Sequence, residues 1–307
     1  MIKATALTKR YGSRTAVDNV DFTVRPGTVT GFLGPNGAGK STTMRMIVGL
    51  DKPSAGSVTV NGKAYREYRA PMREVGVLLD AKAVHTGRSA YKHLLAMGAT
   101  HGIGKARVQE VIELTGLASV ARKRVGGFSL GMGQRLGIAA ALLGDPATLI
   151  LDEPVNGLDP EGVQWVRKLV RHLAAEGRTV LLSSHLMSEM AQTADHIIVL
   201  GRGRVLADAP VSDIIAGAGG STVRVRTPRP ELLAQALPDA QQTPLSDGAI
   251  SLNGVTAEQV GEAAAVHGVV LHELTPVASS LEEAYMALTQ DEVEYRAGGA
   301  VPVGGTR

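Results

Sequence analysis

The sequence has no cysteine and no long apolar run, and each absence excludes a class of protein. Without cysteine the 307 residues can form neither a disulfide framework nor a thiolate metal site, which fits a reducing compartment. No run approaches the roughly 18 apolar residues that a membrane-spanning helix requires. Residues 1–5 lack the apolar core of a signal peptide. Any role at a membrane is therefore expected to be peripheral.

The chain also lacks a large excess of positive or negative charge. The net charge is only +3, and the 32 lysines and arginines are scattered along the chain. We therefore expect no nucleic-acid partner. Hydrophobic residues make up 44% of the chain and charged residues 20%, which is ordinary for a globular protein. The length accommodates one α/β domain of about 200 residues and a smaller second domain.

Residues 34–42, Gly-Pro-Asn-Gly-Ala-Gly-Lys-Ser-Thr, match the phosphate-loop pattern G-x-x-x-x-G-K-[ST]. Glycines allow the backbone to fold tightly around an anion and to direct successive N–H groups at it. Lys40 supplies a positive charge for the outer phosphates, and the Ser41 hydroxyl can ligate Mg²⁺. A short buried strand is predicted at Val29–Leu33 and a helix at Thr42–Val48. This context predicts a nucleoside triphosphate site.

Strands and helices alternate over the first 200 residues. An antiparallel portion is predicted from strands at Ile2–Leu7, Val20–Val24 and Gly56–Val60, the last followed by an Asn61-Gly62 turn. A largely helical insert is predicted at about residues 90–143. The remaining predictions are strands at Val75–Leu79, Thr148–Leu151, Thr179–Ser183 and His196–Leu200, and helices at Glu161–Ala175 and Met187–Ala194. This order predicts an α/β fold with a mainly parallel sheet.

The composition changes at residues 216–221, Ala-Gly-Ala-Gly-Gly-Ser, which we interpret as a linker after a first domain of residues 1–215. A small α+β module is predicted over residues 222–290, and residues 291–307 are expected to be disordered. The module's predicted order is β-α-β-β-α-β, typical of a split βαβ unit. Its elements are strands at Thr222–Arg226, Gln241–Leu245, Ala249–Leu252 and Val269–Leu274, helices at Glu231–Ala236 and Ala257–His267, and a final helix at Ser280–Leu288 capped by Ser279 or Ser280.

Two adjacent carboxylates end the apolar strand at residues 148–151. Asp152 is placed to hold Mg²⁺, and Glu153 could orient or deprotonate an attacking water, although an exposed acidic turn explains the same residues. Three further residues have two interpretations each. Ser129 either caps a helix or opens an anion site, His185 is either structural or functional, and Tyr11 is either an exposed loop residue or a platform for adenine.

Taken together and in this order, these features resemble the ATP-binding subunit of an ABC transporter over residues 1 to about 210. The resemblance rests on the phosphate loop, a signature at Phe128–Met132, the carboxylates after Leu149–Leu151, a turn at Asn156–Asp159 and the histidine His185. It implies a phosphate-loop ATPase domain with an antiparallel subdomain and a helical insert. It also implies ATP as substrate and Mg²⁺ as cofactor.

The resemblance assigns a role to each of these residues. It implies Glu153 and His185 as catalytic residues, Asp159 in the dimer loop, and a metal held by Ser41 and Asp152. Ser129 and Gly131 are expected to contact the nucleotide of a second subunit, most simply a second copy of this chain. The nucleotide-binding residues implied within one chain are Tyr11, Gly34, Asn36, Gly37, Gly39, Lys40, Ser41 and Thr42.

The chain departs from the family pattern in two places. The signature usually reads L-S-G-G-Q, whereas Phe128, Leu130 and Met132 differ here. A glutamine normally follows the strand at residues 75–79, where it touches Mg²⁺ and the membrane subunit, and this chain has Asp80 there. Asp80 still offers the metal an oxygen on a shorter, anionic side chain. Residues at about 80–94 are expected to receive a transmembrane permease subunit.

The resemblance is nearest to the bacterial drug-export group, in which ATPase and membrane subunits are separate chains. The leading hypothesis is therefore an ATP hydrolase that powers an exporter from the cytoplasmic face of the membrane by dimerising on ATP. The alternative is a soluble ABC-type ATPase acting on ribosomes or DNA, although such relatives usually carry two ATP domains or a long coiled-coil insert. A phosphate-loop small-molecule kinase is the third class, and it has no use for Ser129, Gly131 or His185.

Overall fold

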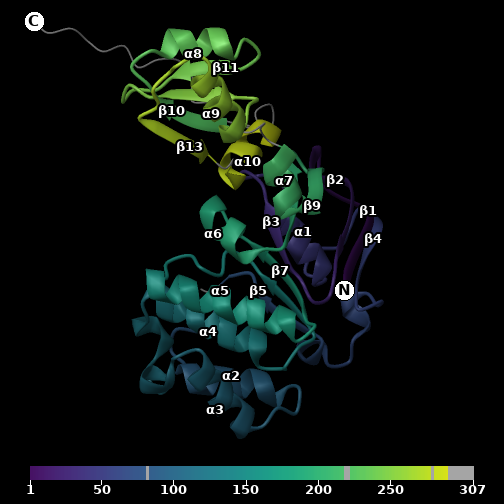
Figure 1. Ribbon diagram of the computed structural model, residues 1–307. Helices are drawn as coiled ribbons and strands as arrows, with labels where there is room; N and C mark the ends of the chain where they lie inside the picture. Colours follow the sequence, from purple (N-terminus) through teal and green to yellow (C-terminus); the bar gives the residue numbers. More distant parts are fainter. Residues whose placement is uncertain (81–82, 218–221, 278–279, 290–307) are drawn as a thin grey trace, which may run out of the picture.

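A mixed sheet in the order β5-β6-β7-β3-β8-β9 lies at the centre of the first 210 residues (Figure 1). The computed structural model describes residues 1–80, 83–217, 222–277 and 280–289. The sheet consists of β5 (Val75–Leu78), β6 (Thr148–Leu151), β7 (Thr179–Ser183), β3 (Val29–Leu33), β8 (His196–Gly201) and β9 (Arg204–Pro210). The strands from β5 to β8 are parallel, and β9 pairs antiparallel with β8 at the edge. The predicted parallel sheet is confirmed.

The edge strand β9 was not predicted from the sequence. It follows β8 through a two-residue turn in which Arg202 has φ +44° and Gly203 has φ +79°. A turn with two positive φ values matches the twist of a β-hairpin, but Asn-Gly or Asp-Gly is the usual signal for it. Arg202 is an uncommon residue for such a turn, so the hairpin is not evident from the residue types.

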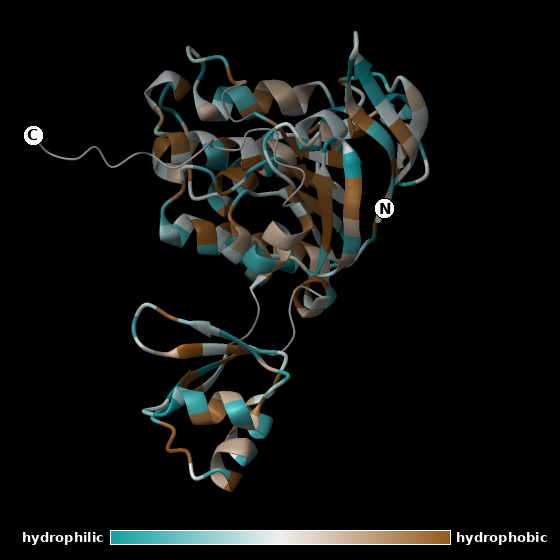
Figure 2. Ribbon diagram, turned by 90° about the horizontal axis from the view of Figure 1, so that it is seen from above, coloured by the Kyte–Doolittle hydropathy of each residue, from teal (hydrophilic) through white to brown (hydrophobic). Residues whose placement is uncertain are grey.

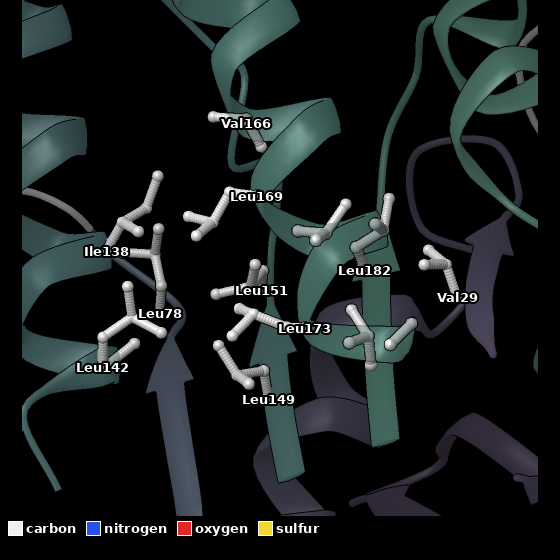
Figure 3. Close-up of a cluster of buried hydrophobic side chains, with 14 of the residues drawn as sticks. Val29, Leu78, Ile138, Leu142, Leu149, Leu151, Val166, Leu169, Leu173 and Leu182 are labelled. Carbon is white, nitrogen blue, oxygen red and sulfur yellow. The ribbon is translucent and has the colours of Figure 1, made fainter. Parts of the chain in front are cut away.

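Alternate side chains of the central strands enter two different cores. Leu149 and Leu151 of β6 point to one face of the sheet, where they pack with helical residues such as Leu169 and Leu173 (Figure 3). Ile150 of the same strand belongs to the core on the opposite face. Both faces of the sheet are therefore covered, which explains why its strands are continuous apolar runs.

The second core lies between the central sheet and an antiparallel sheet in the order β2-β1-β4. This sheet consists of β1 (Ile2–Tyr11), β2 (Arg14–Val24) and β4 (Ala55–Val60). The rings of Phe22 and Phe32 meet across this core with centroids 5.5 Å apart. The antiparallel subdomain is confirmed, with β1 and β2 longer than expected because their outer ends continue the hairpin beyond the buried alternation.

Helices cover the sheet and form the insert. They are α1 (Lys40–Ile47), α2 (Ala90–Ala99), α3 (Lys105–Leu114), α4 (Leu130–Leu142), α5 (Pro160–Ala175), α6 (Met187–Thr193) and α7 (Val211–Gly217). Short 3₁₀ turns occur at Tyr65–Glu67, Pro71–Arg73, Ala118–Val120 and Val125–Gly127. The predicted helical insert corresponds to α2, α3 and α4. None of the helices in the described ranges is long and apolar enough to cross a membrane.

The C-terminal module has its own sheet and core. Its sheet, in the order β11-β12-β10-β13, is antiparallel throughout and consists of β10 (Thr222–Arg226), β11 (Gln241–Pro244), β12 (Ile250–Asn253) and β13 (Glu273–Val277). Two helices, α8 (Pro230–Ala236) and α9 (Ala257–Val266), complete the β-α-β-β-α-β order. Viewed from above, this module stands apart from the ATPase part (Figure 2). The module has a hydrophobic core of its own.

The last strand of the module begins later than predicted, at Glu273 rather than Val269. Gly268 takes φ +63°, and the Val269 N–H donates to the Ala264 carbonyl at 2.8 Å. This is the hydrogen-bond pattern that closes a helix C-terminus, in which the residue after the glycine packs back on the helix. Val269 is accordingly buried in the module's core.

The last helix, α10 (Leu281–Thr289), packs on the ATPase domain and not within the module. Its residues Leu281 and Ala284 join the larger core of that domain, together with Ile214 of α7. Ser280 caps it as predicted, because its hydroxyl accepts from the Glu283 N–H. The module expected at residues 222–290 includes this helix, whereas α10 contacts α6 and α7 of the ATPase domain.

The expected linker begins too early as well. The helix α7 continues through Ala216 and Gly217, because Val211 and Ile214 bury one face of this short helix against α10. Residues 218–221, the expected cap Ser279 and the expected disordered residues 291–307 lie outside the described residues.

Candidate functional site

Three strands of the central sheet end at the same edge, and each carries a part of the site. Residues 34–39 follow β3, Asp152 and Glu153 follow β6, and Ser184 and His185 follow β7. The register aligns these ends, since Phe32 pairs with Ser183 and Leu151 with Leu182. Ligand sites of open α/β sheets lie at the carboxyl ends of the strands.

A cavity of about 400 Å³ opens at this edge. It is lined by Tyr11, Arg14, Ala16, residues 35–42, Asp152 and Glu153, a set that includes most of the predicted nucleotide-binding and acidic residues. Gly34 lies directly behind it, with its carbonyl bonded to Lys40. Arg14 was not among the predicted residues, because the first residue of β2 carries no motif.

The phosphate loop needs its glycines for space and for backbone conformation. Gly39 has φ +103°, and a Cβ added there would lie 2.7 Å from the Ala16 carbonyl oxygen. A Cβ added at Gly34 would lie 2.5 Å from the Leu200 carbonyl oxygen. Any side chain at either position would thus displace backbone of a neighbouring strand or turn. Because α1 begins at Lys40, its N–H groups and its positive dipole end face the cavity.

Lys40 is the principal cation of the loop. Its Nζ donates to the Gly34 carbonyl at 2.5 Å and to the Pro35 carbonyl at 3.2 Å. Burial lowers the pKa of Lys40 below its ordinary value, while the nearby Glu153 and Asp152 act in the opposite direction. A bound phosphate would favour the charged ammonium and so reverse the effect of burial.

Asp152 is held by two hydroxyl groups. The Ser41 Oγ donates to its Oδ2 at 2.8 Å, and the Ser183 Oγ donates to its Oδ1 at 2.5 Å. Ser41 therefore lies beside the carboxylate with which it was predicted to share a metal. In the described part of the chain, no group of three or more histidine and acidic side chains could hold a metal by itself. Mg²⁺ sites on nucleotides commonly use only one or two carboxylates and take their other ligands from phosphates and water.

Glu153 has a strained backbone that two side chains hold in place. Its φ is +50°, a region that residues with a Cβ rarely adopt. The Glu153 N–H donates to the Ser183 Oγ at 2.9 Å, and the Glu153 carbonyl accepts from the Gln134 Nε2 at 2.8 Å. Both Ser183 and Gln134 are buried. No role was predicted for either residue, because their contacts cross from β7 and α4 to the loop after β6.

His185 lies against Glu153, the other residue for which the resemblance implies a catalytic role. The His185 Nδ1 is 2.7 Å from the Glu153 Oε2, and the imidazole is largely exposed. The helix α6 begins two residues later and is tied to α5 through Arg167, which donates to Glu189 and Gln192. His185 therefore meets the cavity-lining Glu153 from a fixed helix start, although it does not itself line the cavity.

Tyr11 stands at the rim of the cavity with an exposed ring. The Tyr11 hydroxyl donates to Asp51 at 3.0 Å, and Lys9 Nζ lies 4.8 Å from the ring centroid. Asp51 also accepts from the Arg45 Nε at 2.8 Å. These contacts fix the orientation of the ring in a position suited to stacking on a planar base.

Four other predicted residues do not line this cavity among the described residues. Ser129 caps α4 by accepting from the Met132 N–H at 3.2 Å, and Asp159 caps α5 by accepting from the Gly162 N–H at 2.9 Å. Gly131 packs close to the Gly157 backbone. Asp80 is exposed beyond β5. The cavity of one chain is thus built without the signature residues.

A larger cavity of about 780 Å³ lies at the opposite ends of the strands. It is lined by the first residues of β3 and β8 and by charges of both signs, including Lys3, Arg25, Asp21 and the His196–Asp208 pair. Acidic and basic groups alternate around it, so its lining favours no single class of ligand.

Comparisons with known proteins agree with this geometry. The family model described as ABC transporter matches residues 17–156, and a domain of unknown function matches residues 221–282. Among solved structures, the "Structure of ATP binding subunit of ABC transporter" has a TM-score of 0.64 and 28% identity, covering 70% of this chain and 91% of that one. A dimeric bacterial ABC transporter cassette has a TM-score of 0.63 and 26% identity, covering 68% and 98%.

Curated relatives extend the comparison. The bacitracin transport ATP-binding protein BcrA of Bacillus licheniformis is 43% identical over 68% of this chain and 70% of its own length. The daunorubicin resistance ATP-binding protein DrrA3 of Streptomyces coeruleorubidus is 38% identical over 81% and 78%. YhcH, an uncharacterised ABC transporter ATP-binding protein of Bacillus subtilis strain 168, is 36% identical over 94% and 97%. The chain belongs to the ABC transporter family, as an ATP-binding and ATP-hydrolysing subunit.

Proposed function

We propose that this chain powers a drug or antibiotic exporter as a dimer, together with a separate transmembrane subunit. The relatives named for bacitracin transport and daunorubicin resistance support export of this class of compound. The dimeric cassette among the similar structures supports pairing of two ATP-binding subunits, here most simply two copies of this chain. The proposed place of action is the cytoplasmic face of the membrane.

The observation that carries this proposal is that one chain supplies only half of an ATP site. The cavity contains Lys40, Ser41, Asp152 and Glu153, whereas Ser129 lies outside it at the start of α4. The N-terminus of α4 is the positive end of a helix dipole, which suits an anion. A second copy can bring this helix end to the outer phosphates of the first, and the first can do the same in return.

Within the site, we assign each residue one task. Lys40 and the loop N–H groups bind the phosphates, and the Tyr11 ring stacks on adenine. Glu153 orients or deprotonates the attacking water, and the His185 imidazole, 2.7 Å from its carboxylate, holds it in position.

The residues around Asp152 fit Mg²⁺, since its carboxylate and the Ser41 hydroxyl are hard oxygen donors 2.8 Å apart. Ser41 and Asp152 would hold the ion, which would supply positive charge to offset the negative charge that develops on the phosphates. Asp80 is the proposed replacement for the usual glutamine, with residues 80–94 as the surface that receives the transmembrane subunit.

We also propose a revised division of the chain. The ATPase domain comprises residues 1–217 together with α10, and the module comprises residues 222–277. The supporting observation is that Leu281 and Ala284 of α10 are buried in the core of the ATPase domain. The module is thus inserted between two segments of that domain, and its position is constrained at both ends.

Two substitutions test the assigned chemistry. Glu153→Gln should bind ATP and stay trapped as a dimer, with hydrolysis reduced by a factor on the order of 10²–10³. Lys40→Ala should lose most ATP binding and therefore should not dimerise. Size-exclusion chromatography in the presence of ATP measures dimerisation, and the release of phosphate from ATP is measured in parallel. Together they distinguish the two variants. Wild-type turnover in Glu153→Gln would show that Glu153 is not the base.

The membrane partner can be tested by purification of the tagged chain from detergent-solubilised membranes. A transmembrane protein recovered in constant ratio supports the proposal, and Asp80→Arg should reduce that recovery. Lys105→Glu, at an exposed position of α3 outside residues 80–94, serves as the control. Recovery only from the soluble fraction, without a membrane protein, would contradict the transport role.

A further inference from the structure

The first two turns of α4 contact the segment that leaves Glu153 in the same chain. The buried Gln134 side chain donates to the Glu153 carbonyl at 2.8 Å. A Cβ added at Gly131 would lie 3.0 Å from the Gly157 carbonyl oxygen, so helix and turn are in close contact there. Two separate points of residues 153–157 therefore rest on α4.

Leu130 adds a third contact, at a position where the family signature usually has glycine. A Cβ added at Gly157 would lie only 2.3 Å from the Leu130 Cδ2, so the leucine side chain packs directly over this glycine. Gly157 has φ +75°, and both its conformation and the space around it exclude a larger residue. The departure from the family pattern thus creates a contact that a glycine at position 130 could not make.

We propose that Leu130 and Gln134 are positioning residues that couple the two ATP sites of the dimer. The inference rests on the proposed function, in which Ser129 and Gly131 meet the ATP held by the partner subunit, while Glu153 serves this chain's own ATP. Because α4 is a single 13-residue helix, its first turns move together when the helix start binds phosphate. Gln134 then transmits that movement to Glu153.

The backbone of Glu153 is suited to such a signal. Its φ of +50° is a strained conformation that persists only while surrounding contacts enforce it. The Gln134 amide is one of those contacts, and the carboxylate direction depends on the backbone to which it is attached. Phosphate bound by one subunit's α4 therefore helps to aim the base of that same subunit at its own water.

The test uses the purified full-length chain and three variants. Gln134→Leu keeps the side-chain size and removes the hydrogen bond, and Leu130→Gly restores the family residue. Gln164→Leu, the same replacement at an exposed position of α5, is the matched control. ATP binding, ATP-driven dimerisation in the Glu153→Gln background, and the ATP dependence of turnover are measured for each.

Gln134→Leu should reduce kcat roughly 10- to 100-fold while ATP affinity and dimerisation remain within about 2-fold of their unsubstituted values. Leu130→Gly should lower the Hill coefficient of turnover from about 2 toward about 1. A general loss of structure would instead weaken ATP binding as well. Turnover of Gln134→Leu within about 2-fold of wild type, or an unchanged Hill coefficient in Leu130→Gly, would overturn the role of that residue.

The outcome separates this inference from the proposed function. If Glu153→Gln loses hydrolysis but Gln134→Leu does not, only the coupling is refuted. If Glu153→Gln hydrolyses ATP normally, Glu153 is not the base, and the proposed coupling through Glu153 is refuted as well.

Discussion

Replacement of Ser183 by alanine should destabilise the ATPase domain by about 2–4 kcal/mol. The Ser183 side chain is fully buried, accepts from the Glu153 N–H at 2.9 Å and donates to the Asp152 carboxylate at 2.5 Å. A buried donor left without a partner costs about 1–3 kcal/mol, and a lost hydrogen bond to a charged group about 1.5–3 kcal/mol. The sum is reduced because Glu153 can relax part of its backbone strain, worth about 1–3 kcal/mol.

This effect can be measured by urea unfolding and by calorimetry. For a domain of this size, each 1 kcal/mol shifts Tm by about 2–4 °C, so a loss of about 2–4 kcal/mol should lower the transition of the ATPase domain by about 4–16 °C. Hydrogen exchange should also show that the Glu153 amide loses protection. The control is Ser188→Ala, at an exposed position of α6, which should stay within about 0.5 kcal/mol of wild type.

The result that would refute the reasoning is a Ser183→Ala protein as stable as Ser188→Ala. It would mean that water replaces the hydroxyl at both partners, so that the contact holds Glu153 without contributing to stability. If the Glu153 amide also remained protected in that variant, the hydrogen bond to Ser183 would not be what retains the strained backbone of Glu153.

Two further predictions concern charge. Because burial lowers the pKa of Lys40 and bound phosphate favours its charged form, ATP binding at about pH 9 should take up protons, and affinity should rise as pH falls. Calorimetry in two buffers of different ionisation enthalpy measures this proton uptake. The uptake should vanish at about pH 7. If no uptake occurred at about pH 9, the assignment to Lys40 would be contradicted. Ala284→Asp should detach α10, since it buries a charge at a fully covered position, at a cost of at least about 3 kcal/mol. Faster hydrogen exchange in α10 is the readout, and Ala287→Asp, at an exposed position of the same helix, should leave exchange unchanged.

Local patterns were sufficient for much of the ATPase domain. The strands β3, β6 and β7 are short apolar runs with polar residues at their carboxyl ends, so their position and type follow from the residues alone. The phosphate loop is similarly local, because its glycines, lysine and serine act within nine consecutive residues. Parallel pairing then brings Asp152, Glu153 and His185 to the loop without further information.

The errors lie where a segment's partner is distant in the chain. The expected boundaries at residues 216 and 290 followed composition, but α7 and α10 bury their apolar faces against each other across the intervening module. The strand expected at Val269 begins later because the glycine before it closes a helix. Composition is a property of one segment, whereas burial depends on whether another segment packs an apolar face against it.

The nucleotide-binding site could be predicted from residue types alone, because the groups that hold phosphate must be close together in the chain to be presented by one turn and one helix start. Only the tertiary structure decided how the catalytic carboxylate is held. Glu153 owes its strained backbone to Ser183 and Gln134, which come from a different strand and a different helix. No spacing in the sequence connects these residues, since a hydrogen bond across packed elements is set by the packing.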